Sequence, residues 1–207
     1  MTPAPLPSEL AAAFPAPIRM EHRAILSIRG RELSLSGHLV ADPDRGLRLL
    51  ILHTFGQVLA DVAVAPSGNV SIWRRADWFR EAWVRDYLIR DAVLLFAPGL
   101  APGGTWNRCA TTAGSAWERP LGQADQRLFC QDDAGGTGRL MEIRRGETVR
   151  WRAEGLAARD VPGLTGRQPG RYRIQGETYS LDLTVLSTEP ATNTAAFFPA
   201  EDNTLRR

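Results

Sequence analysis

The chain has 207 residues, of which 43% are hydrophobic and 23% are charged, and its formal net charge is +2. A chain of this length can bury roughly 70% of its unfolded surface around a single core. So small an excess of positive charge does not indicate a nucleic-acid partner, and no apolar run approaches the roughly 18 residues that a membrane-spanning helix needs.

Residues 1–20 are predicted to form a proline-rich N-terminal tether. Prolines occupy every second position from the third to the seventh residue, and closely spaced prolines block both helices and strand ladders. Residues 21–187 are expected to form a single domain, and residues 188–207 a C-terminal tail with few periodic contacts. Within that tail, Phe197 and Phe198 could dock on the body of the domain.

Alternation of apolar and polar residues predicts a run of antiparallel strands in the first part of the domain. These strands are expected within residues 21–29, 33–39, 58–64 and 70–73. The run from Leu47 to Thr54 differs, because Leu49 to Leu52 are apolar on both faces. This strand is therefore expected to be buried on both sides, so another segment must cover its second face.

The hydrophobic period changes after Asp77, which could cap the N-terminus of a helix over residues 77–90. Phe79, Trp83 and Tyr87 recur at intervals of four residues and form an apolar stripe. Such a helix is amphipathic and needs a sheet to lie on. The apolar run at residues 91–97 is predicted to return to a strand.

The second half of the chain is predicted to begin with a long irregular crossing and then resume the meander. The crossing, residues 98–126, is expected to hold one or two short strands. Further strands are predicted within residues 128–131, 139–144, 149–153, 171–174 and 179–185, with a loop at residues 155–170. Cys109 and Cys130 are either joined by a disulfide across neighbouring segments or remain two half-buried thiols.

No sequence motif indicates catalytic chemistry. A nucleophilic serine elbow, G-x-S-x-G, is absent. His22, His38 and His53 each fall inside a strand run, where a structural or surface histidine is the usual case. The loop from Asp132 to Gly138 is not followed by the helix and lysine of a phosphate-binding loop, so a hairpin loop is expected. We therefore expect no catalytic residue, no metal and no cofactor.

The predicted fold class is α+β and mostly β, with a curved antiparallel sheet, or half-barrel, covered by one or more lid helices. Bulky apolar side chains could line a cavity between sheet and helix, with neighbouring arginines at its mouth to meet an anionic headgroup. The alternative is that the same side chains simply fill a core. The candidate ligand-binding residues are Leu50, Leu52, Trp73, Trp78, Phe79, Trp83, Tyr87 and Trp151.

The stretch from Leu33 to Ala65, with its pattern from Leu47 to Asp61, and residues 170–174 and 179–183 resemble the LolA/LolB-like group of bacterial lipoprotein carriers and receptors. The resemblance implies an apolar cavity that accepts acyl chains, and a role in transferring lipid or lipoprotein to the outer membrane. It also implies a non-enzymatic, periplasmic monomer that contacts lipid or an acylated protein. An N-terminal lipid anchor and contact with the outer-membrane surface are further expectations.

Two other functions remain open at this point. A structural or protein-interaction module of the envelope would have a filled core. An esterase-like enzyme would require a role for His53.

Overall fold

The computed structural model describes residues 17–97, 100, 105–109, 116–121, 126–132, 139–156 and 170–198. Several predicted segments lie wholly or largely outside these ranges, namely the N-terminal tether, the loops at 132–138 and 155–170, much of the crossing at 98–126, and the end of the C-terminal tail.

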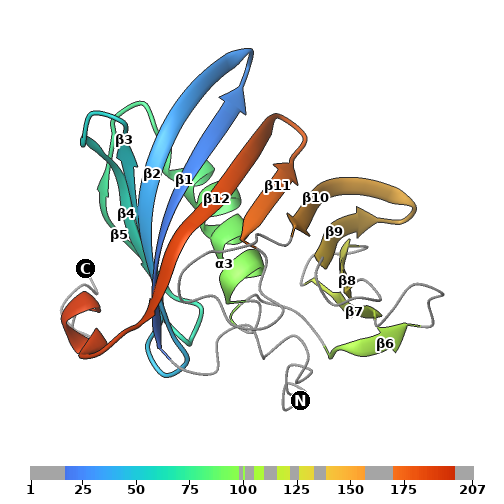
Figure 1. Ribbon diagram of the computed structural model, residues 1–207. Coiled ribbons are helices and arrows are strands. Elements are labelled where there is room, and N and C mark those ends of the chain that lie inside the picture. Colours follow the sequence, from blue (N-terminus) through green and yellow to red (C-terminus); the bar gives the residue numbers. More distant parts are fainter. Residues whose placement is uncertain are drawn as a thin grey trace, which may run out of the picture.

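The described strands form one twelve-stranded sheet in which every neighbouring pair is antiparallel (Figure 1). In the first half of the chain they are β1 (Ile18–Ile28), β2 (Arg31–Asp42), β3 (Gly46–His53), β4 (Val58–Val64) and β5 (Val70–Arg75). In the second half they are β6 (Asn107–Cys109), β7 (Ala116–Pro120), β8 (Gln126–Asp132), β9 (Arg139–Arg145), β10 (Thr148–Leu156), β11 (Arg171–Gln175) and β12 (Tyr179–Pro190).

The sheet consists of two meanders joined at its centre. Strands β1 to β5 follow one another outward to one edge, and β12 back to β6 follow one another to the other edge. Pairing of β1 with β12 connects the two halves. Because β5 and β6 do not pair, the sheet curves without closing (Figure 1). The predicted mostly-β fold with a curved antiparallel sheet is confirmed.

The helix differs from the prediction at both ends. It comprises α2 (Glu81–Trp83), a π-helical segment η1 (Val84–Ile89) and α3 (Arg90–Phe96). Asp77 does not cap it, because Arg80 occupies the N-cap position and makes no side-chain capping bond. The predicted strand at residues 91–97 is wrong, since residues 91–96 continue the helix.

The second error has a simple physical cause. Every residue from Asp91 to Phe96 is buried, because α3 lies in the hollow of the sheet (Figure 1). A helix covered on all sides loses the apolar stripe of a surface helix, and a short apolar run then reads equally well as a strand. No helix in the described part of the chain is long and apolar enough to cross a membrane.

The outer face of β3 is partly covered by the C-terminal segment. A 3-10 helix, η3 (Thr194–Phe197), packs near β2, where the Thr194 hydroxyl donates to buried Asp42. Arg48 on β3 donates to the backbone oxygen of Phe197 at 2.9 Å. The predicted docking of Phe197 on the body is therefore confirmed, and η3 supplies part of the cover that β3 was expected to need.

The turn into β3 requires a glycine for two reasons. Gly46 has φ of +102°, and a Cβ added there would lie 1.9 Å from the carbonyl oxygen of Val64. Gly30, in the β1–β2 turn, has φ of +73° but has nothing within 4 Å of an added Cβ. A side chain at Gly30 would therefore cause backbone strain alone, whereas one at Gly46 would cause both backbone strain and a steric clash.

We expect Gly30→Ala to lower the free energy of unfolding by about 1 kcal/mol, the cost of positive φ. Gly46→Ala should cost about 1 to 3 kcal/mol more, because the clashing atom belongs to a paired strand. Urea denaturation of both variants measures the difference. Equal losses would mean that β4 moves aside without cost.

Candidate functional site

An apolar cavity lies between the helix and the concave face of the sheet. Its volume is about 50 Å³. From the sheet it is lined by His22, Ala24, Leu26, Leu35, Leu49, Ile51, Ile174, Tyr179, Leu181 and Leu183, and from the helical side by Phe79, Trp83, Tyr87, Leu88, Asp91, Ala92, Leu95 and Phe96. Strands from both meanders therefore contribute to a single wall.

Three of the eight candidate ligand-binding residues, Phe79, Trp83 and Tyr87, line this cavity. Leu50 and Leu52 do not. The neighbouring Leu49 and Ile51 line it instead, because successive residues of a strand point to opposite faces. In a strand that is apolar on both faces, the sequence alone does not show which set faces inward.

The remaining three candidates lie elsewhere. Trp73 is 38% exposed and lies beneath the guanidinium of Arg48, 4.2 Å from the ring centroid. Trp78 is 55% exposed and stacks on Phe79. Trp151 is buried and lines a second cavity, described below.

The aromatic rings on the helical side form a continuous row that ends on β12. Ring centroids lie 4.9 Å apart for Phe79 and Trp83, and 5.7 Å apart for Trp83 and Tyr87. Tyr87 then meets Tyr179 edge to face at 5.3 Å. Such pairs add to the stabilisation from buried area, so the row attaches the helix to the centre of the sheet.

A buried polar network anchors the same part of the helix. Asp91 is 4% exposed. Its carboxylate accepts hydrogen bonds from the Tyr179 hydroxyl and from Nε and Nη2 of Arg90, the latter at 3.2 and 2.9 Å. Nη2 of Arg90 also donates to the Tyr179 hydroxyl oxygen at 3.0 Å. Burial raises the pKa of Asp91 to about 6, although Arg90 and Tyr179 oppose the shift.

His22 on β1 is the other buried polar residue of the cavity wall. Its ring lies against Gly37, where an added Cβ would be 2.3 Å from Nε2. Its Nδ1 has no hydrogen-bond partner in the described structure. Burial, with a smaller contribution from the nearby His38, lowers the pKa of His22 to about 4. The imidazole is therefore neutral at physiological pH and behaves as part of an apolar wall.

The described lining of the cavity contains few polar side chains. No serine, threonine or cysteine is among its described lining residues, and the hydroxyl beside Asp91 is the phenol of Tyr179. His53, the residue an esterase would need, lies at the end of β3 against the ring of Phe55. It does not line the cavity.

A second, larger cavity adjoins the first beyond Tyr87, which lines both. Its volume is about 730 Å³. It lies between the helix and the hairpin of β9 and β10, and the remaining lining residues are Arg85, Asp86, Arg90, Leu121, Gln126, Ile143, Arg145, Arg150, Trp151 and Glu177. Unlike the first cavity, it is lined by several charged side chains together with apolar ones.

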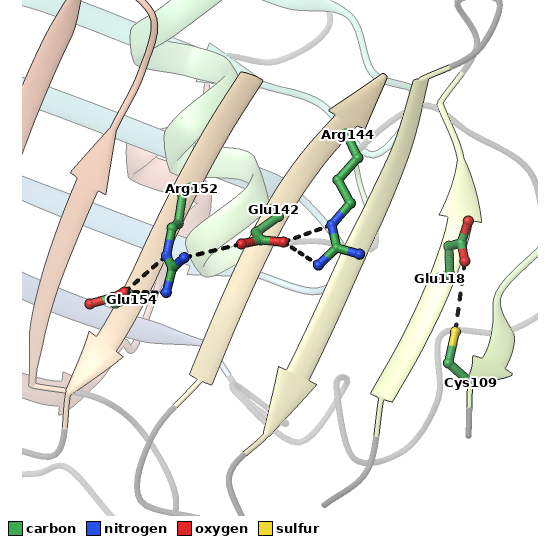
Figure 2. Close-up of polar contacts among 6 residues, drawn as sticks. All are labelled: Cys109, Glu118, Glu142, Arg144, Arg152 and Glu154. Carbon is green, nitrogen blue, oxygen red and sulfur yellow. Dashed lines mark hydrogen bonds and ion pairs between the residues drawn. The ribbon is translucent and has the colours of Figure 1, made fainter. Parts of the chain in front are cut away.

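The outer face of the second meander carries an ion-pair ladder that is separate from both cavities (Figure 2). Glu142 on β9 is buried and pairs with Arg144 at 2.7 Å and with Arg152 on β10 at 3.4 Å. Arg152 also pairs with Glu154 at 2.7 Å. Two guanidinium groups therefore compensate the buried carboxylate of Glu142.

The cysteines are not joined by a disulfide. Cys109 lies on β6 and Cys130 on β8, with β7 between them. The Cys109 sulfur instead lies 3.8 Å from Oε2 of Glu118 on β7 (Figure 2). Of the two predicted alternatives, separate thiols are therefore observed.

Sequence reasoning did not single out His22, Asp91 or Tyr179 as cavity residues. A signal was available for Asp91, which is the only charged residue between Arg90 and Ala97. A charge inside an apolar run is rarely buried unless it is paired, and its partner Arg90 is adjacent. Tyr179 had no comparable signal, because its role depends on a contact between distant segments.

Comparison with known proteins supports the fold. No family model and no curated protein matches the chain in sequence. Among solved structures, an outer membrane lipoprotein-sorting protein domain from Vibrio parahaemolyticus is similar at TM-score 0.53 and 10% identity, over 90% of this chain and 91% of that chain. A DUF1329 family protein from Desulfovibrio piger is similar at TM-score 0.54 and 8% identity, over 90% and 92%. The resemblance to the LolA/LolB-like group is confirmed as one of fold.

The lowered pKa of His22 predicts how stability responds to acid. In the unfolded chain His22 becomes protonated below about pH 6.5, whereas in the folded chain it stays neutral down to about pH 4. Folding is therefore progressively weakened between these values, by roughly 3 kcal/mol in total. We expect His22→Leu to gain about this much stability relative to wild type as pH falls from 7 to 4.

Urea denaturation at several pH values measures the difference. The raised pKa of Asp91 acts in the opposite direction, but it is present in both proteins and cancels in the comparison. A difference that stays constant with pH would show that His22 is not neutral and buried in solution.

Proposed function

We propose that this protein is a non-catalytic cell-envelope protein that binds acyl chains of a lipid or lipoprotein between its helix and sheet. The observation that carries the proposal is the apolar cavity. Phe79, Trp83 and Tyr87 form one side of it, and residues of both meanders form the other. An almost wholly apolar lining suits a hydrocarbon chain, because each buried methylene contributes about 0.8 kcal/mol.

The proposal extends to the location and partners of the protein. The similar Vibrio parahaemolyticus domain is named for outer membrane lipoprotein sorting, which supports a role in lipid or lipoprotein transfer. We propose a periplasmic monomer that contacts lipid or acylated protein, with contact to the outer-membrane surface and an N-terminal lipid anchor.

The size of the cavity requires the helix to move when a ligand binds. A cavity of about 150 Å³ accommodates one benzene ring, whereas this one measures about 50 Å³. An acyl chain therefore cannot enter while the helix occupies the hollow. We propose that the described structure is the closed state and that the chain enters as the helix shifts away from the sheet.

The π-helical segment η1 is a suitable place for the helix to change its conformation. Residues 84–89 are π-helical, and π-helical turns are rare and frequently lie at functional sites. The segment begins directly after the lining residue Trp83 and ends beside the Arg90 and Asp91 network. Residues 84–89 could thus change pitch while α3 stays attached through Asp91.

The small cavity also favours a second function. If the helix never leaves, the rings simply fill a core, and the protein is a structural or protein-interaction module of the envelope. The two functions differ in one measurable property, which is uptake of lipid by the purified protein.

We expect the purified protein to retain phospholipid after incubation with a bacterial lipid extract, as measured by native mass spectrometry. Ala24 on β1 lines the cavity and is buried. Ala24→Leu should reduce retained lipid several-fold, because the added carbons occupy space that the acyl chain would use.

The matched control is Ser34→Leu, which adds the same side chain at an exposed position of β2 outside the cavity. It should bind lipid as wild type does. Absence of lipid from the wild-type protein would refute the binding function and favour the filled-core module. Equal binding by Ala24→Leu would place the acyl chain elsewhere.

Movement of the helix predicts a change in hydrogen exchange. With lipid bound, residues 81–89 should exchange several-fold faster than in the free protein, because they leave the concave face of the sheet, whereas α3 should stay protected through its Asp91 anchor. Strands β1 and β12 should be unchanged and serve as the internal control. Slower exchange throughout residues 81–89 would contradict displacement of the helix.

A further inference from the structure

The second cavity contains an excess of positive charge beside the proposed acyl-chain site. Arg85, Arg90, Arg145 and Arg150 line it, against two carboxylates, Asp86 and Glu177. Among the residues that the structure describes, Tyr87 alone lines both cavities. A ligand that reached past Tyr87 would therefore pass from an apolar environment into one rich in arginine.

Two of these arginines have unused hydrogen-bonding capacity. Arg145 forms no ion pair and no hydrogen bond through its side chain within the described structure. Nε and Nη2 of Arg90 donate hydrogen bonds to Asp91 and Tyr179, and Nη1 has no partner among the described residues. Its guanidinium is held over the rings of Tyr87 and Trp151 at 5.3 and 5.9 Å. Arg90 is thus a positioned donor.

A β-bulge brings a third arginine to the cavity. Pairing of β10 with β9 shifts register between Val149 and Trp151, so Arg150 has no opposite residue. A bulge re-aims the side chain of the extra residue. Arg150 accordingly lines the same cavity as Trp151, although residues adjacent in a regular strand point to opposite faces.

The arginines on the outer face of the same hairpin are less available to an anion than Arg150. Arg144 and Arg152 both pair with buried Glu142 (Figure 2). Arg150 also has a partner, Glu177 at 2.7 Å, but that pair is about half exposed, with side-chain exposures of 46% and 54%. An exposed pair contributes little stability, so an incoming anion can replace Glu177 at low cost.

We propose that this cavity binds the phosphate of an anionic amphiphile whose acyl chain occupies the apolar cavity. The inference rests on the proposed function and adds the chemical class of the headgroup. Arginine suits this role because its planar guanidinium forms two parallel hydrogen bonds to phosphate oxygens. Arg145 and Arg150 contact the phosphate from β9 and β10, and Nη1 of Arg90 contacts it from the helix.

The test compares lipids that share their acyl chains and differ in whether they carry a phosphate. Dioctanoyl phosphatidylglycerol, dioctanoylglycerol and inorganic phosphate are titrated into the full chain at low salt, and affinities are measured by calorimetry. We expect phosphatidylglycerol to bind at least about ten-fold more tightly than dioctanoylglycerol, since one charge-assisted hydrogen bond to phosphate corresponds to about that factor.

The variants identify the residues. Arg145→Gln and Arg150→Gln should each lower the preference for phosphatidylglycerol over dioctanoylglycerol, and the double variant should remove most of it while dioctanoylglycerol binds as before. Arg23→Gln is the matched control, because Arg23 is an exposed arginine of β1 that lines neither cavity. It should keep the full preference.

The outcomes separate this inference from the proposed function. Equal affinity for the two lipids would overturn the phosphate site and leave acyl-chain binding intact. Binding of neither lipid would overturn both. Tight binding of inorganic phosphate alone, lost in the double variant, would assign the site to the free anion and overturn its role with a lipid headgroup.

Discussion

Pairing of β1 with β12 is the interaction on which the rest of the structure depends. It joins two meanders, each of which would otherwise present an open inner edge. The concave wall of the apolar cavity spans this junction, since β1, β2 and β3 contribute from one side and β11 and β12 from the other. Neither meander could enclose the helix by itself. The cavity is therefore a property of the junction, and its lining comes from segments far apart in the chain.

The helix covers the apolar concave face of the sheet and also limits the volume of the cavity. A curved sheet with an apolar concave face needs a cover, and residues 81–96 supply it so completely that little empty volume remains. The cover is held at one point by polar groups, where Asp91 meets Tyr179, and along its length by ring contacts. The hydrogen bonds of Asp91 fix the position of α3, whereas the ring contacts depend less on direction. The part of the helix before Arg90 can therefore shift while α3 stays in place. The arginines of the second cavity lie next to that anchor.

Most of the strands could be predicted from alternation, because a sheet with one buried face imposes a period of two on its sequence. The exceptions occur where a segment is buried on every side. Residues 91–96 carry no helical period, so their pattern predicts a strand. Strand β3 is apolar on both faces, so its sequence indicates Leu50 and Leu52 as readily as Leu49 and Ile51, which line the cavity. The bulge at Arg150 was also beyond prediction, since register depends on the partner strand. The local sequence pattern thus predicts most strands, whereas the residues of the site depend on contacts between helices and strands.

The central junction also has a consequence for how the chain reaches its native state. Residues 18–28 cannot complete their pairing until residues 179–190 have been synthesised. At about 5 to 20 residues per second, β1 would present an unpaired edge for on the order of ten seconds or longer, and such non-local pairing folds slowly. Arg19, Glu21 and Arg23 alternate along the exposed face of that strand, where charges discourage edge-to-edge association. The charges of β1 can therefore be understood as protection for a nascent chain that is waiting for its last strand.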